Sequence, residues 1–213
     1  MLVLNIREDY HIHCSYNDHS SIDLTVENVI KKAKELNLQT IAFTEHVRKT
    51  SDWTEKYLDE INLFKGKVSF NVLPGFEAKI LGDGTIDCPD SYLNDKYFII
   101  ASFHTKYINK IQWYGTLLKA IQNENVNVIG HLAPEPEFSL TTQEIRNLGE
   151  EIVSNNKLIE INAKYNRPPL ELLKTFKELG INFHLGSDAH SLMEIGNYNR
   201  IKNLINYIEQ SKG

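Results

Sequence analysis

Short β-rich runs alternate with longer segments of helical period along the chain. Seven runs predict strands, at residues 2–5 continuing to 10–13, 40–43, 68–73, 97–102, 126–129, 158–162 and 181–186. Between them, apolar residues spaced by three and four predict helices over residues 25–36, 111–123, 141–154, 170–179 and 196–210. Because a crossover helix joins parallel neighbours, this alternation predicts an α/β fold with a parallel sheet.

Two architectures fit this pattern, an open doubly wound sheet and a closed β/α barrel. Segments such as YFIIAS and VNVIG are apolar on both faces, which is typical of buried parallel strands. The 213 residues are few for an eightfold barrel of about 250 residues, whereas a seven-stranded barrel fits the length. Neither a repeat nor a linker interrupts the pattern, so we expect a single domain over residues 1–213.

Composition narrows the class of protein. Hydrophobic residues make up 41% and charged residues 24% of the chain, as in ordinary globular proteins, and the net charge of -5 argues against long nucleic acids as partners. No apolar run approaches the ~20 residues of a membrane span, and the first residues lack the features of a signal peptide. We therefore expect a cytoplasmic protein, in which Cys14 and Cys88 are packing residues without a disulfide framework.

Histidine placement is the most informative feature. Seven of the eight histidines fall at or just past the carboxyl end of an expected strand, and so do one glutamate and one aspartate; the nine residues are His11, His13, His19, His46, Glu77, His104, His131, Asp188 and His190. In a parallel barrel all these strand ends lie on one rim, where such enzymes place their chemistry. The remaining histidine, His184, lies within the last expected strand and is interpreted as a packed or supporting residue.

These residue types indicate a transition-metal site. A lone histidine is usually a core or surface residue, but here the joint placement on one rim carries the argument. Imidazole and carboxylate ligands together suit Zn, Mn or Fe(II) better than Ca or Mg. Nine candidate ligands are too many for one ion, so the sequence predicts two or three divalent metal ions.

The ordered motifs DYHIH, His19, TEH, GFE, SFH, GH and GSDAH resemble the PHP family, the polymerase-and-histidinol-phosphatase metallohydrolases, over residues 9–190. The resemblance implies a distorted (β/α)7 barrel, similar to a TIM barrel, with parallel strands inside a ring of helices. It also implies three metals, held by His11, His13, Glu77 and Asp188, by Glu77, His104 and His131 with Glu77 bridging, and by His19, His46 and His190. Glu45 departs from the pattern, since many members carry Asp there.

The implied activity is that of a metal-dependent phosphoesterase similar to histidinol phosphatases. It would hydrolyse a small-molecule phosphate monoester and release phosphate, by attack of a hydroxide held between metals near Glu77 and Asp188. Asn162 and Lys164 share a face of the sixth expected strand and Arg167 follows in the loop, so these three are candidate substrate contacts. A solvated basic loop is the alternative interpretation of this segment.

Three other functions stay open at this point. A phosphodiesterase or exonuclease could stack a base on an aromatic residue near the rim, such as Trp53, Tyr107, Trp113 or Tyr165, although Trp113 lies in a helical pattern that favours packing. A phosphoprotein phosphatase would use the same metals. A non-catalytic regulatory module is less consistent with a chain that has all nine ligand positions.

Overall fold

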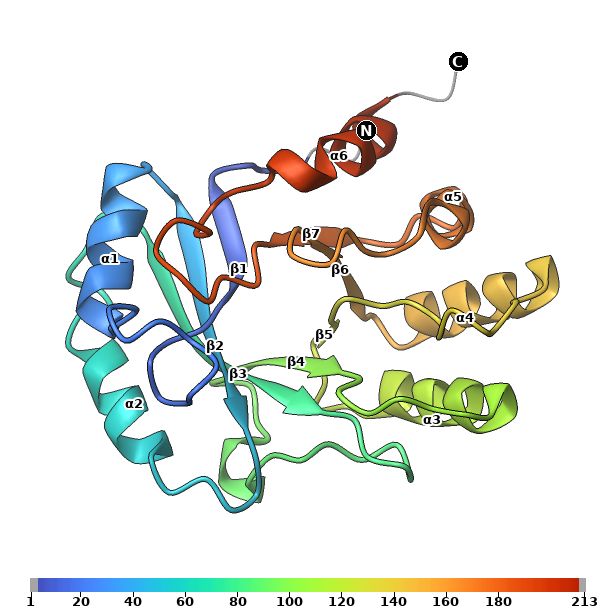
Figure 1. The fold of residues 1–213 in the computed structure, drawn as a ribbon, viewed down its shortest axis with the longest axis horizontal. Helices are drawn as coiled ribbons and strands as arrows, with labels where there is room; N and C mark the ends of the chain where they lie inside the picture. Colours follow the sequence, from blue (N-terminus) through green and yellow to red (C-terminus); the bar gives the residue numbers. More distant parts are fainter. Residues whose placement is uncertain (1–3, 211–213) are drawn as a thin grey trace.

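The computed structural model describes residues 4–210 and shows seven parallel strands in the order β1 to β7. The strands are β1 (Glu8–Ile12), β2 (Thr40–Val47), β3 (Asn71–Lys79), β4 (Phe98–Ser102), β5 (Val128–Ile129), β6 (Leu158–Asn162) and β7 (Phe183–Gly186). In Figure 1 the strands lie at the centre, α1 and α2 flank β1 to β3, and α3, α4 and α5 flank β4 to β7. The expected barrel of parallel strands within outer helices is confirmed.

The barrel closes through the segment that follows β7. Ile12 and Ala189 form a parallel bridge, in which the His13 amide donates to the Ala189 carbonyl (3.1 Å) and the Ala189 amide donates to the His11 carbonyl (3.3 Å). The register between β1 and β2 shifts between Asp9 and Ile12. The first strand and the segment after the last strand therefore meet at the level of the candidate ligands. The expected extension of the first strand into residues 4 and 5 is not formed. Residues 2 and 3 of that extension lie outside the described residues.

The third strand differs from the sequence prediction of residues 68–73. It begins at Asn71 and continues through Pro74 and Gly75 to Lys79, whereas residues 68–70 form the loop before it. A Cβ atom at Gly75 would lie 2.1 Å from the carbonyl oxygen of Phe98, so the glycine lets β4 approach closely. The predicted strand stopped at residue 73, before Pro74 and Gly75, whereas in the structure Gly75 allows the close strand contact that β3 makes beyond that point.

The helices are α1 (Val26–Glu35), α2 (Thr54–Asn62), α3 (Lys110–Gln122), α4 (Thr142–Ser154), α5 (Leu170–Glu178) and α6 (Lys202–Glu209), with short 3-10 turns at Asp90–Tyr92 and Asn199–Ile201. Thr25 caps α1, and Thr141 forms a capping box with Glu144 at the start of α4. The sequence analysis missed α2, and it placed the start of α6 six residues too early, because Tyr198 and Ile201 continue the apolar spacing from a turn. Among residues 4–210, none of the helices has the length and apolar character to cross a bilayer.

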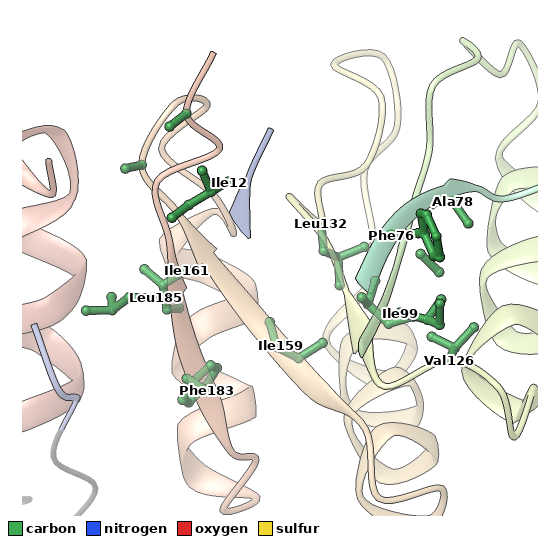
Figure 2. Packing of buried hydrophobic residues seen from close by; sticks show 14 of the residues in the cluster. Ile12, Phe76, Ala78, Ile99, Val126, Leu132, Ile159, Ile161, Phe183 and Leu185 are labelled. Carbon is green, nitrogen blue, oxygen red and sulfur yellow. The ribbon is translucent and has the colours of Figure 1, made fainter. Parts of the chain in front are cut away.

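Alternation along the strands separates the hydrophobic core from the polar interior of the barrel. Phe76 and Ala78 on β3, like Ile159 and Ile161 on β6, belong to the buried hydrophobic cluster (Figure 2), while the glutamates between them, Glu77 and Glu160, are buried among polar groups. On β3 and β6, one strand face therefore packs in the hydrophobic core, and the other face carries the buried glutamates. Cys14, Cys88 and Trp113 are buried, in agreement with packing roles.

Candidate metal centre

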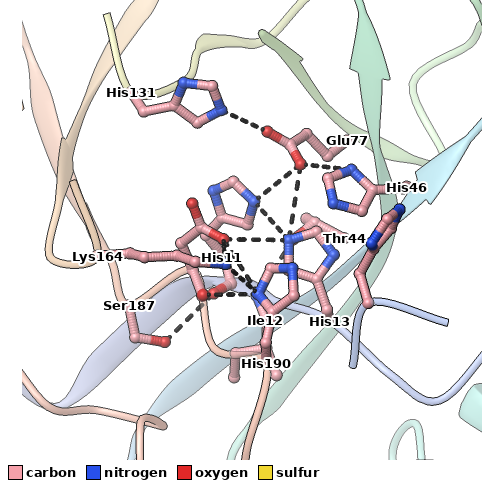
Figure 3. A network of polar contacts seen from close by, with 12 residues as sticks. His11, Ile12, His13, Thr44, His46, Glu77, His131, Lys164, Ser187 and His190 are labelled. Carbon is pink, nitrogen blue, oxygen red and sulfur yellow. Dashed lines mark hydrogen bonds and ion pairs between the residues drawn. The ribbon is translucent and has the colours of Figure 1, made fainter. Parts of the chain in front are cut away.

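Glu77 lies at the centre of a cluster of imidazoles at the carboxyl ends of the strands (Figure 3). Its Oε1 atom is 2.9 Å from His131 Nε2 and 3.4 Å from His104 Nε2. Its Oε2 atom is 2.9 Å from His46 Nδ1, 3.4 Å from His11 Nε2 and 3.6 Å from His13 Nε2. Since the Glu77 side chain is almost fully buried, one carboxylate touches five imidazoles from four strands or their ends.

His11 and His13 direct their Nε2 atoms to the same point. These two atoms are 3.0 Å apart, and each ring contacts a buried carboxylate through its other nitrogen. His11 Nδ1 is 2.6 Å from Glu160 Oε1, and His13 Nδ1 is 3.3 Å from Glu45 Oε1. The carboxylates fix the orientation of both rings, so the Nε2 atoms face the interior of the cluster.

Asp188 completes the cluster from the segment after β7. Its Oδ1 atom is 3.4 Å from His13 Nε2, and its Oδ2 atom accepts a hydrogen bond from Asn162 (3.0 Å). Asp188 has a φ of 55° and His131 a φ of 28°, both in the left-handed region that residues other than glycine seldom adopt. Such backbone strain occurs preferentially at functional sites, where the surrounding structure maintains it.

The donor set fits a divalent metal. Three groups place one ligand atom from each member within 4.8 Å of the others: His13, His46 and His190; His11, His13 and Asp188; and His46, Glu77 and His104. Buried Glu77 Oε2 accepts no well-aligned hydrogen bond from the residues that the structure describes, although His46 Nδ1 lies 2.9 Å away, so a buried acceptor faces the cluster unsatisfied. Imidazole nitrogens and carboxylate oxygens in this arrangement are ligands suited to Zn, Mn or Fe(II).

The electrostatics of the cluster also fit a bound cation. Burial favours the neutral form of Glu77, but the positive charge of His11 and hydrogen bonds from His104 and His131 outweigh it, so the pKa of Glu77 lies well below its usual value. The pKa of Asp188 is also lowered, because His11 and His13 overcome the effect of burial. The buried carboxylates therefore remain ionised and need positive charge beside them, which a cation also provides.

The other predicted ligands lie around this centre. The His190 ring lies beside His13, with ring centroids 4.2 Å apart and the rings tilted by 44°, and its Nδ1 is 2.8 Å from Lys164 Nζ. The exposed side chain of His19 is on the loop after β1, and its ring centroid is 6.1 Å from that of His46. The structure thus brings the nine predicted residues to one end of the barrel, with His19 at the periphery.

Comparison with known proteins identifies the family. The family model for the PHP domain matches residues 9–164, well over half of the chain. The chain belongs to the PHP family. This is a family of hydrolases, and the chain is an enzyme of that class.

Curated relatives and a solved structure extend over most of the chain. A protein of Clostridium novyi named a probable phosphatase is 28% identical over 96% of this chain and 87% of its own length. A second probable phosphatase, from Caldicellulosiruptor saccharolyticus, is 29% identical over 87% of this chain and 81% of its own. The crystal structure of a Listeria monocytogenes protein assigned as a histidinol phosphatase matches with a TM-score of 0.68 and 17% identity, covering 89% of this chain and 97% of that one. This last similarity supports the PHP barrel as the fold.

Two hollows flank the cluster at the mouth of the PHP barrel. One, of about 570 Å³, is lined by His104 and His131 together with Lys106, Tyr165 and Arg167. The other, of about 500 Å³, also includes His104 and is lined by His19, His46, Arg48, Trp53 and Lys79, among others. Two hollows thus border the centre, and each has basic side chains.

The candidate substrate residues occupy different environments. Lys164 is half-buried, with its Nζ atom 3.6 Å from Asp188 Oδ1, and Arg167 lines the hollow beside His131. Asn162 is fully buried, and its amide oxygen accepts a hydrogen bond from the Tyr165 backbone while its amide nitrogen donates to Asp188. Of the aromatic candidates, Tyr107 and Trp113 are buried, whereas Tyr165 is 52% exposed, with its ring centroid 5.1 Å from that of His131.

Sequence reasoning assigned no role at the metal centre to Glu160, whose carboxylate contacts His11. Glu160 shares a strand face with Asn162 and Lys164, so period-two alternation could have placed it inside the barrel. Glu45 was noted only as a departure from the family pattern, yet it accepts hydrogen bonds from the backbone amides of Cys14 and His46, both 2.8 Å long, and from the side chain of Asn17. His184 is packed as expected, between Tyr10 and Phe98.

Proposed function

We propose that the protein is a metal-dependent phosphatase that hydrolyses a small-molecule phosphate monoester. The observation that carries the proposal is the position of Glu77, a buried carboxylate with one unsatisfied oxygen among five imidazoles. The relatives named probable phosphatases, which align over most of this chain, support the same reaction class.

Two or three divalent ions of Zn, Mn or Fe would be held by the nine predicted ligands. His11, His13, Glu77 and Asp188 would hold the first ion, and Glu77, His104 and His131 the second. His19, His46 and His190 would hold the third. The contacts of Glu77 with His11 and His13 through one oxygen and with His104 and His131 through the other support a bridging role for this carboxylate.

The ions, when bound, would lower the pKa of water to supply a hydroxide for in-line attack and would offset charge on the phosphate oxygens. The chain's own residues orient the substrate. Lys164 and Arg167 are the proposed phosphate contacts, since an ammonium and a guanidinium both bind phosphate oxygens. Asn162 would act indirectly, because its amide nitrogen holds the Asp188 carboxylate.

A substrate similar to histidinol phosphate is our leading proposal, supported by the assignment of the Listeria structure and the two hollows beside the centre. Nucleotides and short oligonucleotides are the second candidate, because exposed Tyr165 offers a flat aromatic face beside His131. Phosphoprotein substrates would need only the same centre.

The test is an assay of phosphate release by the purified protein, loaded separately with Zn, Mn or Fe(II). The substrates are a generic phosphomonoester, histidinol phosphate, mononucleotides, a phosphodiester and a phosphopeptide. We expect turnover of a monoester that a chelator abolishes and added metal restores, with no turnover by His11→Ala or Asp188→Ala. Equal turnover by the metal-loaded protein and either variant would contradict the proposed function.

A further inference from the structure

A single buried side chain, Glu160, connects two parts of the centre through its two oxygens. Oε1 is 2.6 Å from His11 Nδ1, and Oε2 accepts a hydrogen bond of 2.6 Å from the backbone amide of His131. Glu160 is fully buried on β6, beneath the histidines. It therefore touches one proposed ligand through its ring and another through its backbone.

We propose that Glu160 is a positioning residue that sets the ligand geometry of two metal sites at once. This inference rests on the proposed function, because His11 belongs to the first proposed metal site and His131 to the second. Through His11, Glu160 fixes which nitrogen faces the ion. Through His131, it holds the backbone in the left-handed conformation that presents the ring to Glu77.

The chemistry of the His11 contact is directional. An ionised carboxylate only accepts hydrogen bonds, so a His11 ring that is neutral, as a metal ligand must be, carries its hydrogen on Nδ1 and turns the lone pair of Nε2 toward the cluster. Such carboxylate–histidine pairs orient metal ligands, and losing them typically costs about 10–100-fold in metal affinity. The Nε2 atom of His11, which then has no hydrogen, lies 3.4 Å from Glu77 Oε2.

The contact with His131 involves the backbone of that residue and not its ring. His131 has a φ of 28°, and its backbone amide is satisfied by Glu160. With this conformation, His131 Nε2 lies 2.9 Å from Glu77 Oε1. One oxygen of Glu160 thus contacts His11, which faces Glu77 Oε2. The other contacts His131, which faces Glu77 Oε1.

Two glycines make room for the Glu160 carboxylate. A Cβ atom at Gly186 would lie 2.0 Å from Glu160 Oε1 and 2.8 Å from the Cβ of His11. A Cβ atom at Gly130 would lie 3.3 Å from Glu160 Oε2 and 2.2 Å from Ser102 Oγ. The space around this side chain is therefore filled on both sides, and the carboxylate has little freedom to move.

Glu160→Gln is the most direct test, because glutamine has nearly the same shape but a single acceptor oxygen. If that oxygen accepts from His131, the amide nitrogen donates to His11 and moves the ring hydrogen to Nε2, where it blocks metal binding. If instead the oxygen accepts from His11, the amide nitrogen of glutamine faces the backbone amide of His131, and neither of these two donors has an acceptor. The probe is Zn²⁺, titrated in competition with a chromogenic chelator, with Glu171→Gln on the exposed start of α5 as the matched control.

We expect Glu160→Gln to bind Zn²⁺ about 10–100-fold more weakly than the unchanged protein, and Glu171→Gln to bind it equally well. Long-range ¹⁵N–¹H spectra of the imidazoles, recorded with Zn²⁺ added, should show His11 with its hydrogen on Nδ1 in the unchanged protein and altered in Glu160→Gln. Zn²⁺ affinity within twofold of the unchanged protein would overturn the positioning role while leaving the proposed function in place. Failure of the unchanged protein to bind any of Zn²⁺, Mn²⁺ and Fe²⁺ would overturn both.

Gly186→Ala tests the same role without changing any charge, and it replaces Glu160→Gln if that variant does not fold. The added methyl group displaces the carboxylate, so the same weakening of Zn²⁺ binding is expected. Gly82→Ala is its control, because a Cβ atom there has no neighbour within 4 Å. A folded Gly186→Ala protein with unchanged Zn²⁺ affinity would contradict the inference.

Discussion

His46 and Glu77 lie directly opposite each other in the register between β2 and β3, and His46 Nδ1 is 2.9 Å from Glu77 Oε2. Adjacent parallel strands thus supply an imidazole and a carboxylate at the same level of the barrel. Because Glu77 is the shared neighbour of five histidines, the loss of its charge should affect more than one ion.

We expect Glu77→Gln to fold and to bind at least one divalent ion fewer per chain. Its kcat/KM for a phosphomonoester should fall at least about 100-fold, because an amide is a far poorer ligand than a carboxylate. Metal content measured by mass spectrometry, together with phosphate release, checks this expectation. Glu150→Gln on the exposed face of α4 is the control, and unchanged metal content in Glu77→Gln would show that this residue does not bridge ions.

Arg167→Ala should raise KM for a phosphomonoester about 10-fold and leave the metal content unchanged. Arg167 lines the hollow beside His131 but makes no contact with the carboxylates of the centre among the described residues, so its proposed role is to bind phosphate. Lys106→Ala is the control in the same hollow, since Lys106 pairs with Glu137 at 2.8 Å. If Arg167→Ala loses metal instead, the phosphate-binding role is wrong.

Gly75→Ala should reduce the free energy of unfolding by about 1–3 kcal/mol, the usual cost of overpacking. The methyl group would lie 2.1 Å from the Phe98 carbonyl and must push β3 away from β4. Chemical denaturation followed by circular dichroism measures the change. Gly115→Ala, in α3 with open space around it, should be neutral or stabilising, and equal behaviour of the two variants would contradict the close strand contact.

His184 should make the protein less stable in acid. Burial lowers its pKa from 6.5 to about 4, and neither ring nitrogen has a hydrogen-bond partner among residues 4–210. Between these pH values the unfolded chain binds a proton that the folded protein does not, so the free energy of unfolding falls as pH falls from 6.5 to about 4, by up to about 3 kcal/mol. His184→Leu should flatten this part of the pH profile, and parallel profiles for both proteins would exclude the effect.

The ligand positions could be predicted because each one follows a strand whose apolar pattern is plain. Parallel strands bring their carboxyl ends together, so even His11 and Asp188, 177 positions apart, could be placed at one rim from sequence alone. The resemblance to the PHP family then distinguished a barrel from an open sheet, which the pattern itself did not.

The failures have physical causes. Helix α2 was missed, although Tyr57, Leu58 and Ile61 have helical spacing, because the segment is short and largely polar. The predicted third strand stopped at residue 73, because its continuation through Pro74 and Gly75 depends on a close contact with β4 that the sequence pattern does not show. The contacts of Glu160 depend on three-dimensional register with β1 and β5, and no local signal in the sequence reports it.

An ion bound at the junction between β1 and the segment after β7 would affect the stability of the barrel as well as its chemistry. His13 and Ala189 join the first and last parts of the barrel by a hydrogen bond, and His13 and Asp188 face each other across the same junction. An ion held there would cross-link β1 to the segment after β7, so metal binding would also stabilise the closure of the barrel. Removing the ion should therefore speed hydrogen exchange at the Ala189 amide before it affects the outer helices.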